Sequence, residues 1–331
     1  MKFHWGNIGI GALMLAAALA GSAQAAQTEV RVARQYGVGY LPLMVMEHRH
    51  LIREQAEAAG LGKIKVSWHT FADGSVANDA LLSGDLDFAG GGTGAFVTLW
   101  AKTRSGSLGV KSVGAMDSMP MFLNTNDPNI KTVKDFTGKH RIGMAGVKVS
   151  PEAMTLQLAA AHAWGQRNYA KLDPLTVGMS HPLAMQALLS GQVAADFTAP
   201  PFQYWELQKP GIHRVLNSYD VWGGPQTFLC VWTTSKFHDD NPKLYAAFAD
   251  ALKQSIDWIN AHKKEAAQIY KTATHDKHSV ESILKILNDP DVDFTMTPKN
   301  VVKFAQWKYK TGAIKVDPKS WKDMFFSNVW H

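Results

Sequence analysis

Ala80-Leu81-Leu82-Ser83-Gly84 recurs 107 residues later as Ala187-Leu188-Leu189-Ser190-Gly191, and this internal repeat decides the fold. An apolar segment with an Asp-Phe pair follows each copy, Leu86-Asp87-Phe88-Ala89 after the first and Ala195-Asp196-Phe197-Thr198 after the second. Helix-like runs that end at glycine and lead into apolar strands are typical of α/β units. The repeat therefore predicts two units built on one plan.

The repeat extends upstream of these helices. Arg31-Val32-Ala33-Arg34 and a helix opening near Pro42 are matched by Arg141-Ile142-Gly143-Met144 and a helix opening at Pro151, at offsets of 110 and 109. Near-constant spacing across two blocks predicts two α/β lobes, each ordered strand, loop, helix, strand, helix, strand. Chance similarity among amphipathic segments is the alternative.

Helix start and stop signals agree with this plan. Ser150-Pro151 is an N-cap followed by proline at the first helical position, and Gly165 stands where that helix should stop. Ser75 and Ser180 can cap the two repeated helices.

Parallel strands joined by right-handed crossover helices place ligand-binding loops at the carboxyl ends of the strands. In this sequence those loops are residues 35–41, 89–94, 145–150 and 198–202. We expect the second lobe, residues 117–220, to be inserted between the two parts of the first, residues 26–116 and 221–331. A ligand would then lie in the cleft between the lobes.

The C-terminal part of the chain is predicted to be helical. Asn241-Pro242 should start a long helix, and Thr297-Pro298 a second one that Gly312 ends. Helical spacing places five apolar residues on one side of the long helix: Leu244, Phe248, Leu252, Ile256 and Ile259. We read this side as a core face.

The first 25 residues have the pattern of a secretory signal peptide. Lys2 precedes an apolar run, Ile8 to Ala20, and Ala23-Gln24-Ala25 fits the cleavage rule. The run is shorter than the roughly 20 residues that span a bilayer, which disfavours an anchor helix. Ser22 stands where a lipoprotein would carry cysteine. We expect a soluble, unlipidated periplasmic protein that begins at Ala26.

Composition excludes several classes of protein. The 306 residues left after cleavage (331 − 25) are enough for two ordinary domains, and 46% hydrophobic with 19% charged residues is globular composition. Basic residues are scattered along the chain, which disfavours nucleic-acid binding. The one cysteine, Cys230, stands in an apolar run and reads as a buried thiol.

Four segments carry a family resemblance: Val32 to His50, Asn78 to Phe88, Val133 to Lys139 and His181 to Phe202. They look like the nitrate, sulfonate and taurine branch of periplasmic binding proteins. That branch is the binding component of ABC importers, and it is similar to thiamine pyrimidine precursor proteins. The resemblance implies the type II periplasmic binding protein fold, a small-molecule ligand and a permease in the inner membrane. We expect a monomer without cofactor or metal.

The resemblance also places residues at the pocket, with Tyr36, Tyr40, Thr93, Ser150 and His181 carried over directly. Each has a structural alternative, since strand-end tyrosines often only pack, serines often only cap helices, and His181 can lie on the surface. The complete set of candidate ligand-binding residues is Tyr36, Tyr40, Ser75, Gly91, Gly92, Thr93, Lys148, Ser150, His181, Pro200, Phe202 and Trp222.

The expected ligand is a small organic anion. Helix N-termini near Ser75, Thr93, Ser150 and Ser180 suit an anion, and Lys148 can pair with it. Many relatives carry an acid in the loop that reads Ala199-Pro200-Pro201-Phe202 here, and its absence disfavours a taurine-like zwitterion. Five residues can form an aromatic wall: Tyr36, Tyr40, Phe71, Phe202 and Trp222. Such a wall makes a planar organic acid as suitable a ligand as a sulfonate or nitrate.

Enzyme alternatives have less support. Gly90, Gly92 and Ala95 fit the glycine pattern of a dinucleotide-binding turn, with Asp117 as the ribose-binding acid, but this is not the first strand-helix unit of the chain. Related thiamine pyrimidine synthases use a cysteine-rich segment, which one cysteine cannot supply. The sequence therefore predicts a solute-binding protein, with a thiamine pyrimidine precursor protein as the alternative.

Overall fold

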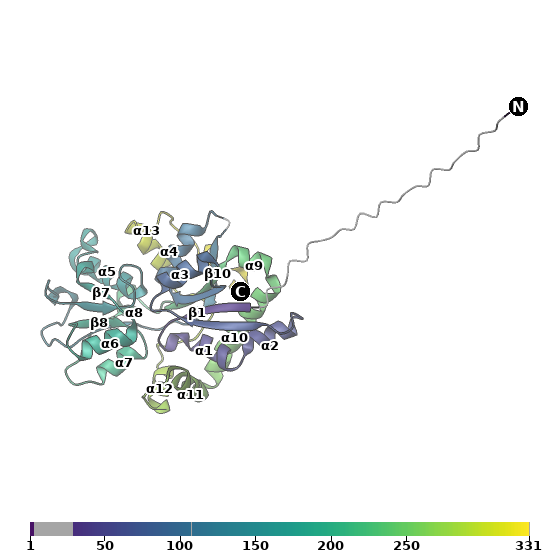
Figure 1. Cartoon of the computed structure of the whole chain (residues 1–331). Coiled ribbons are helices and arrows are strands. Elements are labelled where there is room, and N and C mark those ends of the chain that lie inside the picture. The colour runs from purple at the N-terminus through teal and green to yellow at the C-terminus, as the bar shows by residue number, and fades with distance from the viewer. Residues whose placement is uncertain (3–28, 107, 331) are drawn as a thin grey trace.

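The computed structural model describes residues 1–2, 29–106 and 108–330 (Figure 1). Residues 3–25 of the predicted signal peptide, and its cleavage site after Ala25, lie outside the described residues. Within the described ranges, no helix is both long and apolar enough to cross a membrane.

Two five-stranded sheets organise the chain (Figure 1). The first has the order β2-β1-β3-β10-β4 and contains β1 (Glu29–Arg34), β2 (Lys65–Thr70), β3 (Phe88–Gly92), β4 (Val110–Ala115) and β10 (Leu229–Thr234). The second has the order β7-β6-β8-β5-β9 and contains β5 (Phe122–Thr125), β6 (Ile142–Met144), β7 (Thr176–Gly178), β8 (Ala195–Thr198) and β9 (His213–Asn217). The chain passes between the sheets at residues 116–121 and 218–228. We propose lobe boundaries at residues 117 and 221, within these crossings.

The two sheets share one plan. In each, a central strand pairs in parallel with two neighbours, β1 with β2 and β3 in the first sheet and β6 with β7 and β8 in the second. An antiparallel strand then joins the last parallel strand to the edge, β10 in the first sheet and β5 in the second. The predicted pair of α/β lobes is confirmed.

Helices cover both faces of the sheets (Figure 1). Their bounds are α1 (Leu41–His48), α2 (Leu51–Ala58), α3 (Gly74–Ser83), α4 (Thr93–Thr103), α5 (Pro151–Trp164), α6 (His181–Leu189), α7 (Phe202–Leu207), α8 (Ser218–Trp222), α9 (Ser235–Asp240), α10 (Pro242–Ala261), α11 (Lys263–Thr274), α12 (Val280–Leu287) and α13 (Val301–Lys310). Helix α10 begins at the predicted proline, and the five predicted apolar residues on one side of it are all buried.

The predicted N-caps have mixed outcomes. Ser150 caps α5 as expected, because its hydroxyl accepts a hydrogen bond from the Ala153 amide at 3.2 Å, and Gly165 ends the helix. Ser75 is not a cap. Asp73 occupies that position on α3 and its Oδ1 accepts from the Ser75 amide at 2.7 Å. Ser180 holds the N-cap position of α6, but its side chain makes no capping hydrogen bond there.

Two predicted boundaries are wrong. The last long helix, α13, begins at Val301 rather than at Pro298, because Asn300 takes a left-handed conformation just before it. The expected glycine loop 89–94 is instead strand β3 followed directly by α4 at Thr93. Gly91 lies inside the strand, where a Cβ atom would be 2.8 Å from the Trp232 ring. The glycines therefore allow close packing of lobe 1, and they do not form a phosphate-binding turn.

Asp117 does not fit the dinucleotide alternative either. Its side chain is fully buried and its Oδ1 accepts a hydrogen bond from the Leu229 amide at 3.3 Å. Burial raises the pKa of this carboxyl well above its usual range. A ribose cannot reach it in this conformation.

Candidate ligand-binding site

The lobes touch along two lines of contact. Gly92 and Gly94 of lobe 1 lie against residues 149–151 of lobe 2, so closely that a Cβ on Gly92 would be 2.7 Å from the Pro151 ring. On the other side, the Val38 amide donates a hydrogen bond of 3.1 Å to the Pro200 carbonyl. The cleft between the lobes is closed in this conformation.

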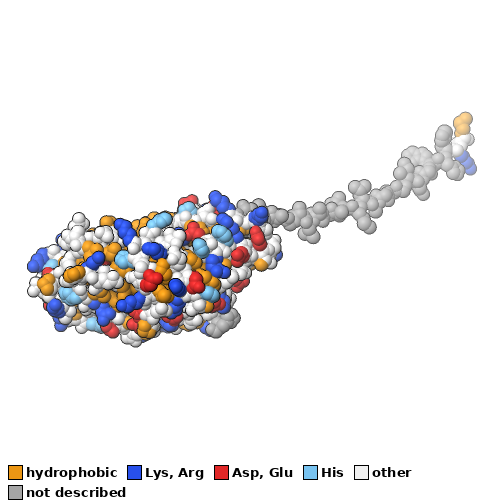
Figure 2. All heavy atoms as spheres, turned by 90° about the horizontal axis from the view of Figure 1, so that it is seen from below, with side chains coloured by type: hydrophobic (Ala, Val, Ile, Leu, Met, Phe, Trp, Pro, Cys, Tyr) orange, Lys and Arg blue, Asp and Glu red, His pale blue; other side chains and the backbone are white. Residues whose placement is uncertain are grey.

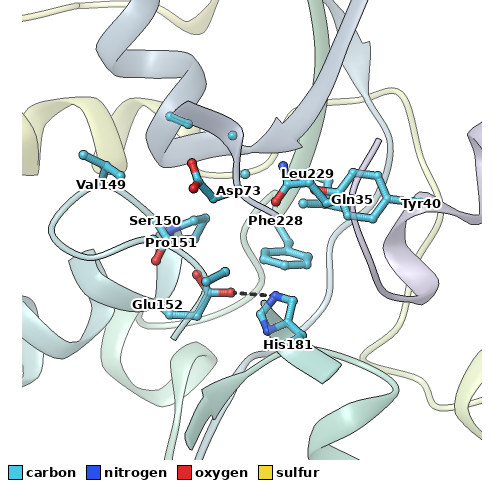
Figure 3. Close-up of a pocket in the computed structure, with 15 residues that line it drawn as sticks. Gln35, Tyr40, Asp73, Val149, Ser150, Pro151, Glu152, His181, Phe228 and Leu229 are labelled. Carbon is cyan, nitrogen blue, oxygen red and sulfur yellow. Dashed lines mark ion pairs between the residues drawn. The ribbon is translucent and has the colours of Figure 1, made fainter. Parts of the chain in front are cut away.

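A cavity of about 30 Å³ lies between these contacts (Figure 3). This volume holds only one or two water molecules, so a larger solute can enter only when the lobes separate. Both lobes contribute to the wall. Its residues are Gln35, Tyr40, Asp73, Gly74, Gly92, Ala95, Phe228 and Leu229 from lobe 1, and Ala145, Gly146, Val149, Ser150, Pro151, Glu152 and His181 from lobe 2.

Glu152 and His181 are the central polar pair (Figure 3). Both stand in the first turn of a helix, Glu152 on α5 and His181 on α6, which brings them to the carboxyl edge of the second sheet. Their Oε1 and Nε2 atoms are 3.6 Å apart, and His181 Nδ1 lies 2.9 Å from Thr198 Oγ1. Contacts within lobe 2 therefore position both side chains, and both face the cavity.

Burial decides the charges of this pair. It raises the pKa of Glu152 to about 7, although hydrogen bonding by the Glu152 amide and the Ser150 side chain lowers this pKa. Burial also lowers the pKa of His181 to about 4, so the ring is neutral at pH 7. The 3.6 Å approach is therefore a weak polar contact and not an ion pair.

Lobe 1 supplies the opposite wall. Tyr40 is 3% exposed, and burial raises the pKa of its hydroxyl well above the usual range, with further contributions from the Asp117 and Glu152 carboxyls. Gln35 Nε2 donates to the Gly90 carbonyl at 3.4 Å. Asp73 adds a carboxylate at the start of α3. The wall thus combines acceptors with an aromatic ring.

Four of the predicted residues line the cavity: Tyr40, Gly92, Ser150 and His181. Three others lie in lobe 1 away from it. Ser75 is exposed, Gly91 packs within β3, and Thr93 Oγ1 donates to the Thr227 carbonyl at 2.9 Å in the lobe interior.

Tyr36 and Phe202 lie on a separate groove of about 600 Å³ between α6, α7 and the end of α11. The Phe202 ring stacks on His181 with 5.8 Å between centroids, so it supports the histidine from behind. Pro200 contributes its carbonyl to the contact between the lobes.

The structure places two further predicted residues, Lys148 and Trp222, outside the cavity wall. Lys148 is exposed and does not line the cavity. The Trp222 indole donates to Thr155 Oγ1 at 2.9 Å and packs on Phe304, on the far side of α5. Phe71 is partly buried and packs against the core of lobe 1. Of the five residues expected to form an aromatic wall, only Tyr40 lines the cavity. Phe228, which was not expected there, lines it as well.

Sequence reasoning missed Gln35, Asp73, Glu152 and Phe228. Asp73 had a readable signal, since an aspartate followed by glycine and serine before an apolar helix is a typical N-cap. Glu152 reads as an ordinary acid in a first helical turn, where the helix dipole favours it. Nothing local marks Phe228, because only the pairing of β10 with β3 brings it to the cavity.

Charge at the cavity differs from the expectation. Among the described residues that line it, none is lysine or arginine, and two are acids, Asp73 and Glu152. Within the described part of the chain, no cluster of three or more histidine, cysteine, aspartate or glutamate side chains could hold a metal ion. Basic and acidic side chains are interspersed on the face seen in Figure 2.

Comparisons with known proteins agree with this architecture. The model of the family described as NMT1/THI5 like matches residues 57–266. No curated protein matches the sequence.

Three solved structures show the same fold at low identity. The periplasmic aliphatic sulphonate binding protein SsuA from Escherichia coli is 18% identical, with 91% of this chain and 98% of that chain covered and a TM-score of 0.67. The alkanesulfonate-binding protein SsuA from Xanthomonas axonopodis pv. citri, bound to MOPS, is 17% identical, with 89% and 96% covered and a TM-score of 0.66. A ligand-binding component of an ABC-type import system from Staphylococcus aureus, with zinc bound, is 15% identical, with 92% and 98% covered and a TM-score of 0.65. The predicted periplasmic binding protein fold is confirmed, and all three neighbours are binding proteins rather than enzymes.

Proposed function

From the premise that the chain belongs to the NMT1/THI5-like family, we propose that it is the periplasmic solute-binding protein of an ABC importer. The observation that carries this proposal is the cavity between the lobes, to which both lobes contribute polar side chains and lobe 1 adds the rings of Tyr40 and Phe228. The likeness to binding components of importers supports it.

The mechanism is capture, closure and delivery. A solute that touches both walls gains contacts only when the lobes meet, so it favours the closed state by its differential affinity. The contacts of Gly92 with Pro151 and of Val38 with Pro200 form in that state. The membrane permease would then recognise the closed shape.

A small organic anion is the ligand class that the sequence favours. The N-termini of α5 and α6 at the cavity support it. The two acids of the wall and the exposed position of Lys148 oppose it. A thiamine pyrimidine precursor is the second candidate, because Tyr40 and Phe228 offer faces for a flat ring.

A ligand screen tests the proposed function. We expect one class of small solutes to raise the melting temperature of the protein from Ala26 onward and to bind one-to-one by calorimetry. A ligand at a hundred times its dissociation constant adds about 2.7 kcal/mol of stability. Binding of NAD with no response to any other solute would contradict the proposal.

A pair of glycine variants tests closure. Gly92→Ala places a methyl group against Pro151 of the other lobe and should weaken binding of the screened ligand at least about tenfold while each lobe stays folded. Gly138→Ala is the matched control, because its Cβ meets no atom within 4 Å. Equal affinities in the two variants would contradict closure at this contact.

Fractionation of cells tests the compartment. The product should be found in the periplasmic fraction with Ala26 as its first residue, because Ala23-Gln24-Ala25 fits the cleavage rule. Recovery in the membrane fraction alone would contradict this.

A further inference from the structure

The cavity carries one acid from each lobe. Asp73 stands at the start of α3 in lobe 1, and Glu152 in the first turn of α5 in lobe 2 (Figure 3). Because the described lining contains no lysine or arginine, no cation of the wall neutralises either carboxylate.

Glu152 is the less satisfied of the two. Its side chain is 1% exposed, its Oε2 has no hydrogen-bond partner among the described residues, and its Oε1 faces His181 Nε2 at a distance beyond a normal hydrogen bond. An acceptor atom left unpaired on a buried carboxyl is costly, so such atoms normally have a partner. Oε2 of Glu152 can therefore accept a hydrogen bond from a donor that enters the cavity.

The shape of the wall limits that donor. The Phe228 ring lies beside His181, and the Tyr40 ring lies next to Gln35 on the lobe 1 side of the same cavity (Figure 3). Flat groups pack well against such rings, and cationic groups are attracted to their faces. A planar donor bound to Glu152 would share the cavity with Asp73, which lines it from lobe 1.

We propose that the ligand carries a planar, cationic nitrogen group of the amidinium type, whose N–H groups donate to Glu152 while Asp73 adds negative charge from the facing lobe. This inference rests on the proposed solute-binding function. It also gives closure an electrostatic cause, since like charges on the two lobes repel each other until a cation lies between them.

Matched probes test the sign of the ligand charge. Benzamidinium and benzoate have the same shape, as do acetamidinium and acetate, and only the charge and the hydrogen-bonding role differ. At pH 8 we expect calorimetry to give at least about tenfold tighter binding for the amidinium member of each pair. Binding of benzamidinium should weaken as the pH falls from 8 to 5, because Glu152 is then protonated.

A neutral variant tests the residue. Glu152→Gln keeps the shape and should weaken benzamidinium binding by about 10- to 150-fold, the range for a charged hydrogen bond. Glu57→Gln on α2 is the control, because it makes the same chemical change at an exposed site far from the cavity. If Glu152→Gln is poorly folded, the pH dependence of benzamidinium binding by the wild-type protein tests the role of Glu152 instead.

Three results would overturn the inference: tighter binding of the carboxylates, an unchanged benzamidinium affinity in Glu152→Gln, or no response to either amidinium. Saturable binding of benzoate or of another screened solute would leave the solute-binding proposal standing. Failure of every solute in the screen would overturn both.

Discussion

Asp87 in lobe 1 and Asp196 in lobe 2 match in the internal repeat, yet their surroundings are opposite. Asp87 accepts from Arg31 three times, at 2.8 Å from the backbone amide, 3.1 Å from Nε and 2.9 Å from Nη2. Asp196 is fully buried beside Glu206, and both of its oxygens lack a donor among the described residues. One sequence pattern thus carries an ion pair in lobe 1 and a pair of acids in lobe 2.

Strand register explains the difference. Val32 pairs with Phe88, whereas its counterpart Ile142 pairs with Ala195, so Ala195 is the structural match of Phe88. Asp196 therefore lies two residues further along its strand than Asp87 does. Because side chains in a strand alternate with a period of two, a shift of two residues keeps the aspartate on the same face of the sheet. It places that aspartate beside different residues. The repeat identified the elements correctly, but its two Asp-Phe pairs do not occupy equivalent positions in their sheets.

The acid pair in lobe 2 depends on protonation. Burial and the neighbouring Glu206 raise the pKa of Asp196 well above its usual range. Burial raises the pKa of Glu206 to about 7, although Asn124 Nδ2 donates to its Oε2 at 2.8 Å. Two adjacent buried carboxyls cannot both be ionised at low cost, so the pair holds a proton.

The largest expected effect is in lobe 1. Asp87→Asn removes the charge that holds Arg31, and we expect the free energy of unfolding to fall by about 3 kcal/mol, because three hydrogen bonds to the carboxylate are weakened at once. Urea unfolding at pH 8 measures it. A loss below about 1 kcal/mol would mean that the ion pair contributes little and would weaken the contrast between the lobes.

The same substitution in lobe 2 should have the opposite sign. Asp196→Asn supplies a neutral donor to Glu206, so at pH 8 the free energy of unfolding should rise by about 2 kcal/mol.

The pH dependence follows from the Glu206 pKa. That pKa rises from 4.5 in the unfolded chain to about 7 in the fold, so the stability it contributes is complete below pH 4.5 and lost as the pH rises to about 7. Asp196→Asn should flatten this loss between pH 5 and 8. An equally steep loss in the variant would exclude the acid pair as its source.

The two repeated helices should differ at their N-termini. Asp73→Ala removes the cap of α3 and should cost about 1 kcal/mol, whereas Ser180→Ala on α6 should cost only a few tenths, because Ser180 makes no capping bond. Thermal unfolding of the two variants compares them directly. Equal losses would mean that the helices are capped alike.

The smallest effect is expected at Lys148. Because this side chain is exposed and outside the cavity wall, Lys148→Ala should leave the dissociation constant of the screened ligand unchanged by calorimetry. A loss of tenfold or more would return Lys148 to the site and support an anionic ligand.

Local patterns determined much of this protein. The repeat predicted two α/β lobes, Asn241-Pro242 fixed the start of α10, and Ser150 with Gly165 marked the ends of α5. The apolar run around Cys230 predicted a buried thiol, and burial raises its pKa to about 12. These features depend on propensity, capping and apolar periodicity, which act within a few residues of the chain.

Tertiary structure alone decided the register of β8 and the charge of the cavity. Glu152 becomes a site residue only because α5 and α6 converge at one sheet edge, and Phe228 only because β10 returns to pair with β3. Lys148 sits in the predicted loop but does not line the cavity. Contacts between residues far apart in sequence are set by packing and strand pairing, so no local pattern could place these side chains relative to one another.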